Sequence, residues 1–223
     1  GSGIPFLDSI PGEILSSLPW PRYYLDFETI NPAVPVWSQS RPWQQIPFQW
    51  SCHVEQEDGS IAAEAWLADG SSDPRPGFIE SLIAAVGNSG AVLVYNAAFE
   101  KGRLQELARD FPRHAAALQA IEDRVFDLYP MTRDHYYHRD QLGSWSIKAV
   151  LPTIAPELDY RDLAIGNGTM AQDAFHQILS PETSREERDR LERALLEYCG
   201  LDTWAMVRLA HHLEGTQCPQ QKV

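Results

Sequence analysis

The sequence predicts one α/β domain with a mixed sheet of five strands flanked by helices, and three observations support this. Five short segments are apolar or alternate in polarity, as strands do. The first three follow one another closely, and the other two alternate with helical patterns, an order typical of a mixed sheet. The 223 residues, 43% hydrophobic and 22% charged, suit one sizeable globular domain. The predicted strands span residues 22–30, 47–56, 61–68, 91–95 and 125–128.

Local signals mark the first three strands. Pro19 and Pro21 punctuate the entry to the first. Asp58-Gly59 separates the second from the third, and this dipeptide between apolar runs is a strong hairpin signal. Residues 31–46 are rich in Pro, Trp and Gln and have no clear period. A long ordered loop is therefore expected between the first two strands.

Helical patterns fill most of the remaining chain. A pattern over 146–151 is expected to break at Pro152, and residues 153–183 have no clear period. The strongest helix spans 184–213, where Ser184 and Glu187 fit a capping box and Gly200 suggests a bend. This long helix follows the last strand, as the final covering element of the domain. The other predicted helices span 78–86, 98–111 and 115–124.

Composition and the two ends set the expected limits of the domain. Gly1-Ser2-Gly3 has the composition of a cloning remnant, so 1–20 is interpreted as a remnant and lead-in, 21–214 as the domain and 215–223 as a flexible tail. An upstream domain of a longer protein is expected. No apolar stretch approaches the ~20 residues of a membrane span. Three isolated cysteines form no zinc or disulfide framework, which indicates a cytoplasmic setting.

The most informative feature is a pair of acids inside the first predicted strand. Asp26 and Glu28 are two residues apart, so in a strand they point to the same face. Paired negative charge is costly to bury unless a positive group compensates it. A divalent cation such as Mg²⁺ or Mn²⁺ would do so, because these ions prefer oxygen ligands. The alternative is two solvated acids at a strand edge.

Two further places carry acids in a suggestive context. Glu100 falls in the first turn of the helix after the fourth strand, where a carboxylate also suits the helix dipole. Asn96 is the expected N-cap of that helix. Tyr198 and Asp202 are four apart in the C-terminal helix and share one face. Each of these observations is also common in proteins without a metal site.

Together, the three places resemble the motifs of the DEDD exonuclease superfamily, the DnaQ-like branch of the ribonuclease H-like fold. Asp26-Phe27-Glu28 matches the DxE motif, and 96–100 looks like Asn-x-x-x-Asp, with Glu100 in place of the Asp. Tyr198 to Asp202 is similar to the Tyr-x-x-x-Asp motif of the DEDDy subclass. The segment 146–151 resembles the Ser-Leu-Lys segment between motifs. The stretches LDFETINPAVP and RPWQQIPFQWSCH look like the uncharacterised bacterial DUF2779 family.

The resemblance implies hydrolysis of phosphodiester bonds from a 3′ end with two Mg²⁺ or Mn²⁺ ions. Asp26 would bridge both ions, Glu28 and Asp202 would complete the first site, and Glu100 would support the second. Tyr198 would orient the attacking water; its unperturbed pKa near ~10 makes it a poor base. The implied substrate is single-stranded DNA or RNA, or a short oligonucleotide. Substrate contacts are expected from Asn96, Lys148, Phe27 and Thr29.

Other interpretations stay open at this stage. The net charge of −13 argues against affinity-driven binding of duplex nucleic acid. A catalytically weak or inactive module that binds nucleic acid or protein is the main alternative, since Glu100 departs from the motif. A phosphodiesterase acting on a dinucleotide or capped nucleotide is a third. Lys148 is equally well explained as a solvated lysine. In the loop, Trp37, Arg41 and Trp43 suit base stacking or, more often, packing.

Overall fold

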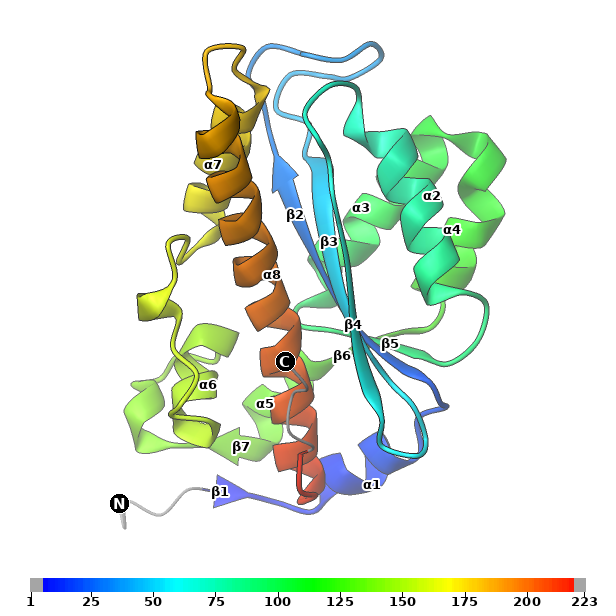
Figure 1. Cartoon of the computed structure of the whole chain (residues 1–223). Coiled ribbons are helices and arrows are strands. Elements are labelled where there is room, and N and C mark those ends of the chain that lie inside the picture. The colour runs from blue at the N-terminus through cyan, green and yellow to red at the C-terminus, as the bar shows by residue number, and fades with distance from the viewer. Residues whose placement is uncertain (1–5, 219–223) are drawn as a thin grey trace.

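The computed structural model describes residues 6–218 and confirms a mixed sheet of five strands flanked by helices. The predicted cloning remnant and the last five residues of the predicted tail lie outside the described residues. The strand order is β4-β3-β2-β5-β6, with β2 at the centre (Figure 1). Strand β2 is antiparallel to β3 and parallel to β5. The strands are β2 Arg22–Ile30, β3 Ile46–Glu55, β4 Ile61–Leu67, β5 Ala91–Val94 and β6 Val125–Asp127.

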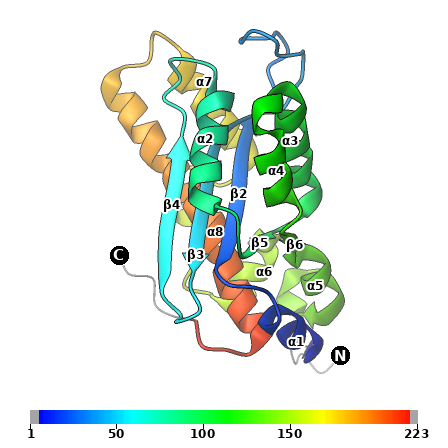
Figure 2. The same ribbon diagram turned by 90° about the vertical axis from the view of Figure 1, so that its right-hand side faces the viewer.

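Helices cover both faces of the sheet. On one face lie α2 (Pro74–Val86), α3 (Ala97–Asp110) and α4 (Ala115–Glu122), which stand in front of the strands in Figure 2. The other face is crossed by α8 (Arg185–Glu214), with α7 (Gly168–Leu179) beside it (Figure 1). The alternation of β2 separates its side chains between the two layers: Leu25 and Phe27 enter the α2–α4 core, whereas Tyr24 enters a core with α8.

The remaining elements close the end of the domain where the chain begins. Short strands β1 (Phe6–Leu7) and β7 (Tyr136–Tyr137) form a second, two-stranded sheet. Helices α1 (Ile10–Ser16), α5 (Leu128–His135) and α6 (Ile147–Ile154) lie near them (Figure 1). The lead-in expected before residue 20 is therefore ordered, and it contributes Leu15 to the core. No helix within the described residues is long and apolar enough to cross a membrane.

One helical expectation was wrong. Helix α6 does not break at Pro152 but continues to Ile154, because proline removes only its own N–H and the Ala155 N–H still reaches the Leu151 carbonyl. Helix α8 is continuous through Gly200, and the bend suggested there stays a prediction. The expected N-cap is present, since the Ser184 hydroxyl accepts from the Glu187 N–H at 3.2 Å. In the unassigned region 153–183 the structure has α7, which packs on β2 and α8.

Buried polar contacts attach the last turns of α8 to the sheet. The Arg22 guanidinium pairs with Glu214 at 2.9 Å, and both side chains are buried. Glu55 of β3 accepts from Tyr24 at 2.8 Å and lies 2.8 Å from His211 Nε2. Removing one partner of a buried pair leaves an uncompensated charge, so these contacts allow little sliding of α8 over the sheet. The position of the residues on α8 that face β2 is thereby set.

Candidate metal centre

Asp26 and Glu28 lie on the same face of the central strand, as alternation predicts. Both side chains belong to β2, paired with Ser51 and Gln49 of β3. The intervening Phe27 points to the opposite layer and meets Phe78 edge-on, with ring centroids 5.0 Å apart. The strand is therefore buried on both faces, and the alternative of two solvated acids at a sheet edge is wrong.

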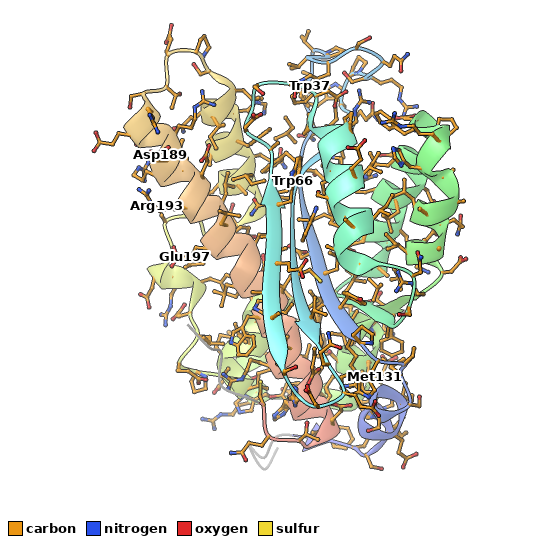
Figure 3. The ribbon with its side chains drawn as sticks, turned by 45° about the vertical axis from the view of Figure 1, so that its right-hand side comes forward. Trp37, Trp66, Met131, Asp189, Arg193 and Glu197 are labelled. Carbon is orange, nitrogen blue, oxygen red and sulfur yellow. The ribbon has the colours of Figure 1, made fainter. Side chains whose placement is uncertain are left out.

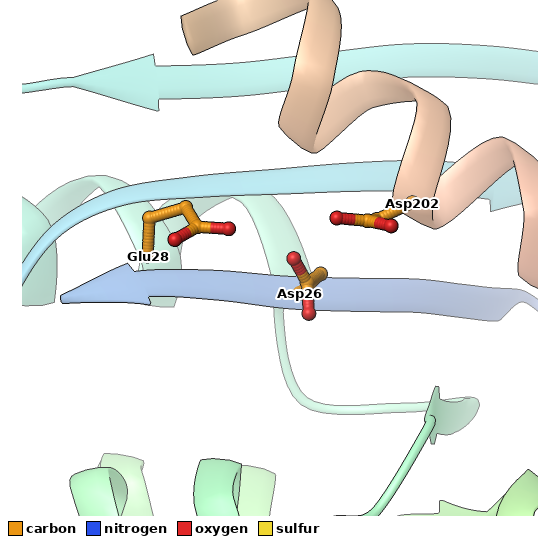
Figure 4. Close-up of side chains that lie close together, drawn as sticks. All are labelled: Asp26, Glu28 and Asp202. Atoms are coloured by element: carbon orange, nitrogen blue, oxygen red, sulfur yellow. The ribbon is translucent and has the colours of Figure 1, made fainter. Parts of the chain in front are cut away.

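Asp202 of α8 joins this pair across the interface between helix and sheet. One carboxylate oxygen from each of Asp26, Glu28 and Asp202 lies within 4.8 Å of the others, as the three side chains in Figure 4 illustrate. Glu28 and Asp202 are buried and Asp26 is partly exposed. Three carboxylates in so small a volume form a set of hard oxygen donors suited to Mg²⁺ or Mn²⁺.

The pKa values of the three carboxyl groups are raised, because holding them close together in their charged forms is unfavourable. Burial, and next the charge of Asp202, raise the pKa of Asp26 to about 8. Burial, followed by the charges of Asp26 and Asp202, raises the pKa of Glu28 well above its usual range. The pKa of Asp202 is also raised by burial, although Lys148 opposes the rise. A divalent cation would favour the charged forms, so the cluster fits a metal better than it fits an empty core.

Glu100 is the predicted fourth carboxylate, and it lies outside the group of three. Its side chain is 2% exposed in the first turn of α3, and its Oε2 has no hydrogen-bond partner among the described residues. Burial, and next the charge of Asp26, raise its pKa to about 9. The structure thus brings three of the four predicted ligands together. It places the fourth, Glu100, close enough for the charge of Asp26 to raise its pKa. A buried, unpaired carboxylate oxygen is costly and rare in native proteins.

Asn96 occupies the N-cap position of α3 but does not cap the helix with its side chain. It adopts a left-handed backbone with φ of 78°, and its side chain makes no capping hydrogen bond. The Asp127 carboxylate at the end of β6 accepts the Asn96 and Ala97 N–H groups instead, both at 2.9 Å. It also accepts the Tyr129 N–H, so one carboxylate binds backbone N–H groups at the N-termini of both α3 and α5. Asp127 thus positions the turn that carries Glu100, a role visible only when β5 and β6 are paired.

Lys148 is not a solvated lysine. Its Nζ donates to the Tyr198 hydroxyl oxygen at 2.5 Å and to the Gly166 carbonyl at 3.2 Å. It also lies over the rings of Tyr198 and Tyr160, at 4.4 and 4.9 Å from their centroids. Lys148, the positive charge that opposes the rise in the pKa of Asp26, Glu28 and Asp202, is thus held by the tyrosine beside them.

Tyr160 is a site residue that the sequence did not indicate. Its hydroxyl donates to Asp202 Oδ1 at 2.7 Å, and its side chain is buried. The residue lies in the irregular stretch between α6 and α7, where periodicity assigns no element. No local signal marks it, because its partner is 42 residues away.

We expect Tyr160→Phe to weaken Mg²⁺ binding about 10- to 100-fold, the usual effect of losing a hydrogen bond that orients a metal ligand. Isothermal titration calorimetry with MgCl₂ measures it. Tyr137→Phe, an exposed position on β7, is the matched control and should bind like the unaltered protein. Equal affinity in both variants would show that the Tyr160 hydroxyl does not orient Asp202.

The other residues predicted to contact a substrate differ from one another in how exposed their side chains are. Phe27 and Thr29 are buried; Phe27 lies in the α2–α4 core, so its side chain is not available to a substrate. In the loop between β2 and β3, Trp37 packs against the core on the α7 side, and Figure 3 labels it at the tip of the domain. Trp43 is 68% exposed. The packing interpretation therefore holds for Trp37, and stacking stays a prediction for Trp43.

The fold and the site define a class of protein. It is an α/β domain in which a central strand and a covering helix contribute buried carboxylates. The chain belongs to the family described as "Domain of unknown function (DUF2779)", whose model matches residues 23–146. That match contains Asp26, Glu28 and Glu100 and ends before Tyr198 and Asp202.

Three curated relatives carry the description of an uncharacterised protein. The chain is 28% identical over 84% of its length to "Uncharacterized protein MG366 homolog" of Mycoplasma pneumoniae and 26% identical over 84% to MG366 of Mycoplasma genitalium. It is 25% identical over 91% of its length to UU173 of Ureaplasma parvum. The chain spans 31%, 31% and 32% of these relatives. Among solved structures, a family B DNA polymerase of Pyrobaculum calidifontis matches 86% of this chain and 24% of its own, with TM-score 0.46 and 15% identity.

Proposed function

We propose that this chain is a metal-dependent 3′–5′ exonuclease of the ribonuclease H-like, DEDD type. It would hydrolyse phosphodiester bonds in single-stranded nucleic acid or short oligonucleotides. The observation that carries the proposal is the convergence of Asp26, Glu28 and Asp202 from two elements far apart in sequence. The order of the acids along the chain, with Tyr198 four residues before Asp202, supplies the resemblance to this class. The direction of hydrolysis rests on that resemblance.

The donor set fits a pair of Mg²⁺ or Mn²⁺ ions. Asp26, Glu28 and Asp202 would hold the first, with Asp26 shared and Glu100 supporting the second. The unpartnered Oε2 of Glu100 and the raised pKa values of the carboxylates support this assignment. When bound, such ions supply an activated water and stabilise negative charge on the attacking and leaving oxygens.

Tyr198 would orient the attacking water by donating a hydrogen bond. Its hydroxyl oxygen accepts from Lys148, and the hydroxyl also forms a hydrogen bond with Asp202 that lowers the pKa of that carboxyl. To orient the water, the hydroxyl hydrogen would turn from Asp202 to the water oxygen. Burial, and next the charge of Asp202, raise its pKa above the usual range, so the hydroxyl stays protonated and is a donor rather than a base. Lys148, held at the same place, would also offset negative charge on a phosphate. These roles need no proton transfer to either side chain.

The direct test uses single-stranded DNA and RNA labelled at either end, incubated with Mg²⁺ or Mn²⁺. Successive shortening from the 3′ end that stops with EDTA supports the proposal. Calorimetry on the same preparation separates the alternatives. Metal binding without turnover on any substrate, including dinucleotides and capped nucleotides, would favour a catalytically weak binding module, an alternative supported by the position of Glu100 outside the three-carboxylate group.

Glu100→Gln is expected to reduce turnover by about 10- to 100-fold, less than loss of a ligand in the central group, because Glu100 would act at the second ion only. Single-turnover cleavage at saturating Mn²⁺ measures the loss. Glu122→Gln is the matched control, since Glu122 is also buried but accepts from Gln105 on the far side of α3. Full activity of Glu100→Gln would contradict a role for Glu100 at the second ion.

A further inference from the structure

The loop between β2 and β3 lies at the end of the domain opposite β7, at the top of Figure 1. It begins directly after Ile30, two residues beyond Glu28, and rejoins the sheet at Ile46, which pairs with Ile30. Trp43 is three residues before Ile46, so their Cα atoms are at most about 11 Å apart. Trp43 therefore lies within roughly 25 Å of Glu28, a distance that a single strand of several nucleotides spans at about 3.4 Å or more per nucleotide.

The edge of β2 beside the metal centre is open. Strand β5 pairs only with residues 22–24, so no strand of the described chain covers this edge from residue 25 to residue 30. Helix α7 begins nearby, since a Cβ on Gly168 would lie 3.9 Å from Glu28 Oε2. An extended strand laid along this edge leads from the metal centre to the loop that contains Trp43.

Trp43 has an unfavourable backbone conformation and an exposed side chain. Its φ is 60°, in the left-handed region. The Gln44 N–H donates to the Arg41 carbonyl at 3.1 Å, which closes a β-turn with Pro42 and Trp43 at its centre. Because proline fixes a negative φ, this is a type II turn, whose third residue is usually glycine since a Cβ is unfavourable there. Packing does not compensate, because Trp43 is 68% exposed. Backbone strain of this kind is retained mainly where it serves a function.

Buried contacts fix this turn to the helix that carries Glu100. The Gln44 side chain is 8% exposed; its Oε1 accepts the N–H of the first turn residue at 3.0 Å, and its Nε2 donates to Asp110 of α3 at 2.9 Å. Arg103, one turn after Glu100 on α3, donates to Gln45 at the end of the loop. The indole is thus held in place before any ligand arrives, so a contact with it would cost little ordering.

Arg41 supplies a positive charge two residues from the indole. It is exposed, and its guanidinium forms no ion pair or hydrogen bond with another described residue. The chain has a net charge of −13, so a free guanidinium beside an exposed indole is a local exception that suits a phosphate. Val34 and Val36 of the same loop are also exposed, as a protein interface would require. The free charge of Arg41 and the open edge of β2 favour a single-stranded nucleic acid over a protein partner.

We propose that Trp43 stacks on a base of the single strand whose 3′ end lies at the metal centre, while Arg41 contacts a neighbouring phosphate. The position of the 3′ end rests on the proposed function. The sugar-phosphate backbone between the two points would follow the open edge of β2. Because every base has a π-face, this contact should strengthen the binding of strands several nucleotides long with little preference for sequence.

The test is fluorescence anisotropy of 5′-labelled strands of about 12 thymidines or uridines, a length within the usual range of single-strand binding sites. Ca²⁺ replaces Mg²⁺ to slow hydrolysis, because it binds carboxylates without the octahedral geometry of Mg²⁺. Trp43→Ala should weaken binding about 5- to 100-fold, the usual effect of losing one stacked base, and Trp43→Phe should restore most of the affinity. The control Tyr137→Ala removes another exposed aromatic ring, on β7, and should bind like the unaltered protein.

Two further measurements distinguish stacking from a structural role of the tryptophan. A single abasic nucleotide moved along the strand should weaken binding at one position in the unaltered protein. It should have no further effect there in Trp43→Ala, because the two changes remove the same contact. Trp43→Gly should bind as weakly as Trp43→Ala but melt about 2–4 °C above the unaltered protein, because glycine relieves the left-handed backbone.

Four results would overturn the proposal. They are no binding of either strand by the unaltered protein, equal affinity in Trp43→Ala, equal loss in Tyr137→Ala, and an abasic effect that is the same with and without Trp43. Loss of self-association in Trp43→Ala with unchanged affinity for both strands would assign the loop to a protein interface instead. Turnover is measured separately: strands that bind through Trp43 but are never hydrolysed with Mg²⁺ or Mn²⁺ would contradict the exonuclease and leave the stacking contact in place.

Discussion

Asp26→Asn should reduce metal-dependent hydrolysis by at least about a thousandfold. The change keeps the shape of the side chain but removes the charge proposed to be shared by two ions. Metal stabilisation of the transition state is worth several kcal/mol, and about 4 kcal/mol corresponds to a factor of roughly 10³ in rate. Hydrolysis of a 3′-terminal nucleotide under single-turnover conditions, over a range of Mn²⁺ concentrations, measures the loss.

The control for this variant is Asp173→Asn, an exposed position on α7 with the same chemical change. It should retain full activity. Circular dichroism should show the same fold in both variants, because asparagine removes a repulsive charge from the interior without removing volume. Activity in Asp26→Asn within about tenfold of the unaltered chain would locate the catalytic centre elsewhere. Replacing a ligand shared by two ions should reduce the rate by much more than tenfold.

The second large effect concerns stability without metal. Asp26 and Glu100 have folded-state pKa values raised to about 8 and about 9, above the ~4 of an unfolded carboxyl. The folded protein then holds protons that the unfolded chain has released. This contribution to stability is complete below pH ~4 and is lost as the pH rises through 8 to 9. The metal-free protein should therefore become less stable from pH 6 to pH 9.

Mg²⁺ should reverse this trend, because it binds the deprotonated cluster of the folded state. At about a hundred times the Kd it should add roughly 2–3 kcal/mol, or about 5–10 °C in Tm, and more at pH 8.5 than at pH 6. Thermal melts with MgCl₂ or EDTA at the two pH values measure this. In Asp26→Asn the Mg²⁺ effect should vanish and the metal-free Tm at pH 8.5 should rise. A Tm that is independent of Mg²⁺ at both pH values would contradict the metal assignment.

Much of the framework follows from short-range rules. Alternation along a strand places Asp26 and Glu28 on one face, and Asp58-Gly59 places the hairpin. Helical spacing puts Tyr198 and Asp202 on one face of α8. The one wrong helix prediction was local too: a proline such as Pro152 usually ends a helix, but α6 packs against two clusters of the core and continues past it.

The sequence alone determined which residues are acidic and which of them share one face of a strand or helix. Side-chain direction within an element depends only on the period of that strand or helix. The tertiary structure decided which acids meet. Asp202 reaches Asp26 because buried contacts such as Arg22–Glu214 attach α8 to the sheet, and Glu100 stays outside the group of three. It also decided that Tyr160 holds Asp202 and Lys148 holds Tyr198. Contacts between residues so far apart in the chain depend on how whole elements dock, and no local pattern encodes that geometry.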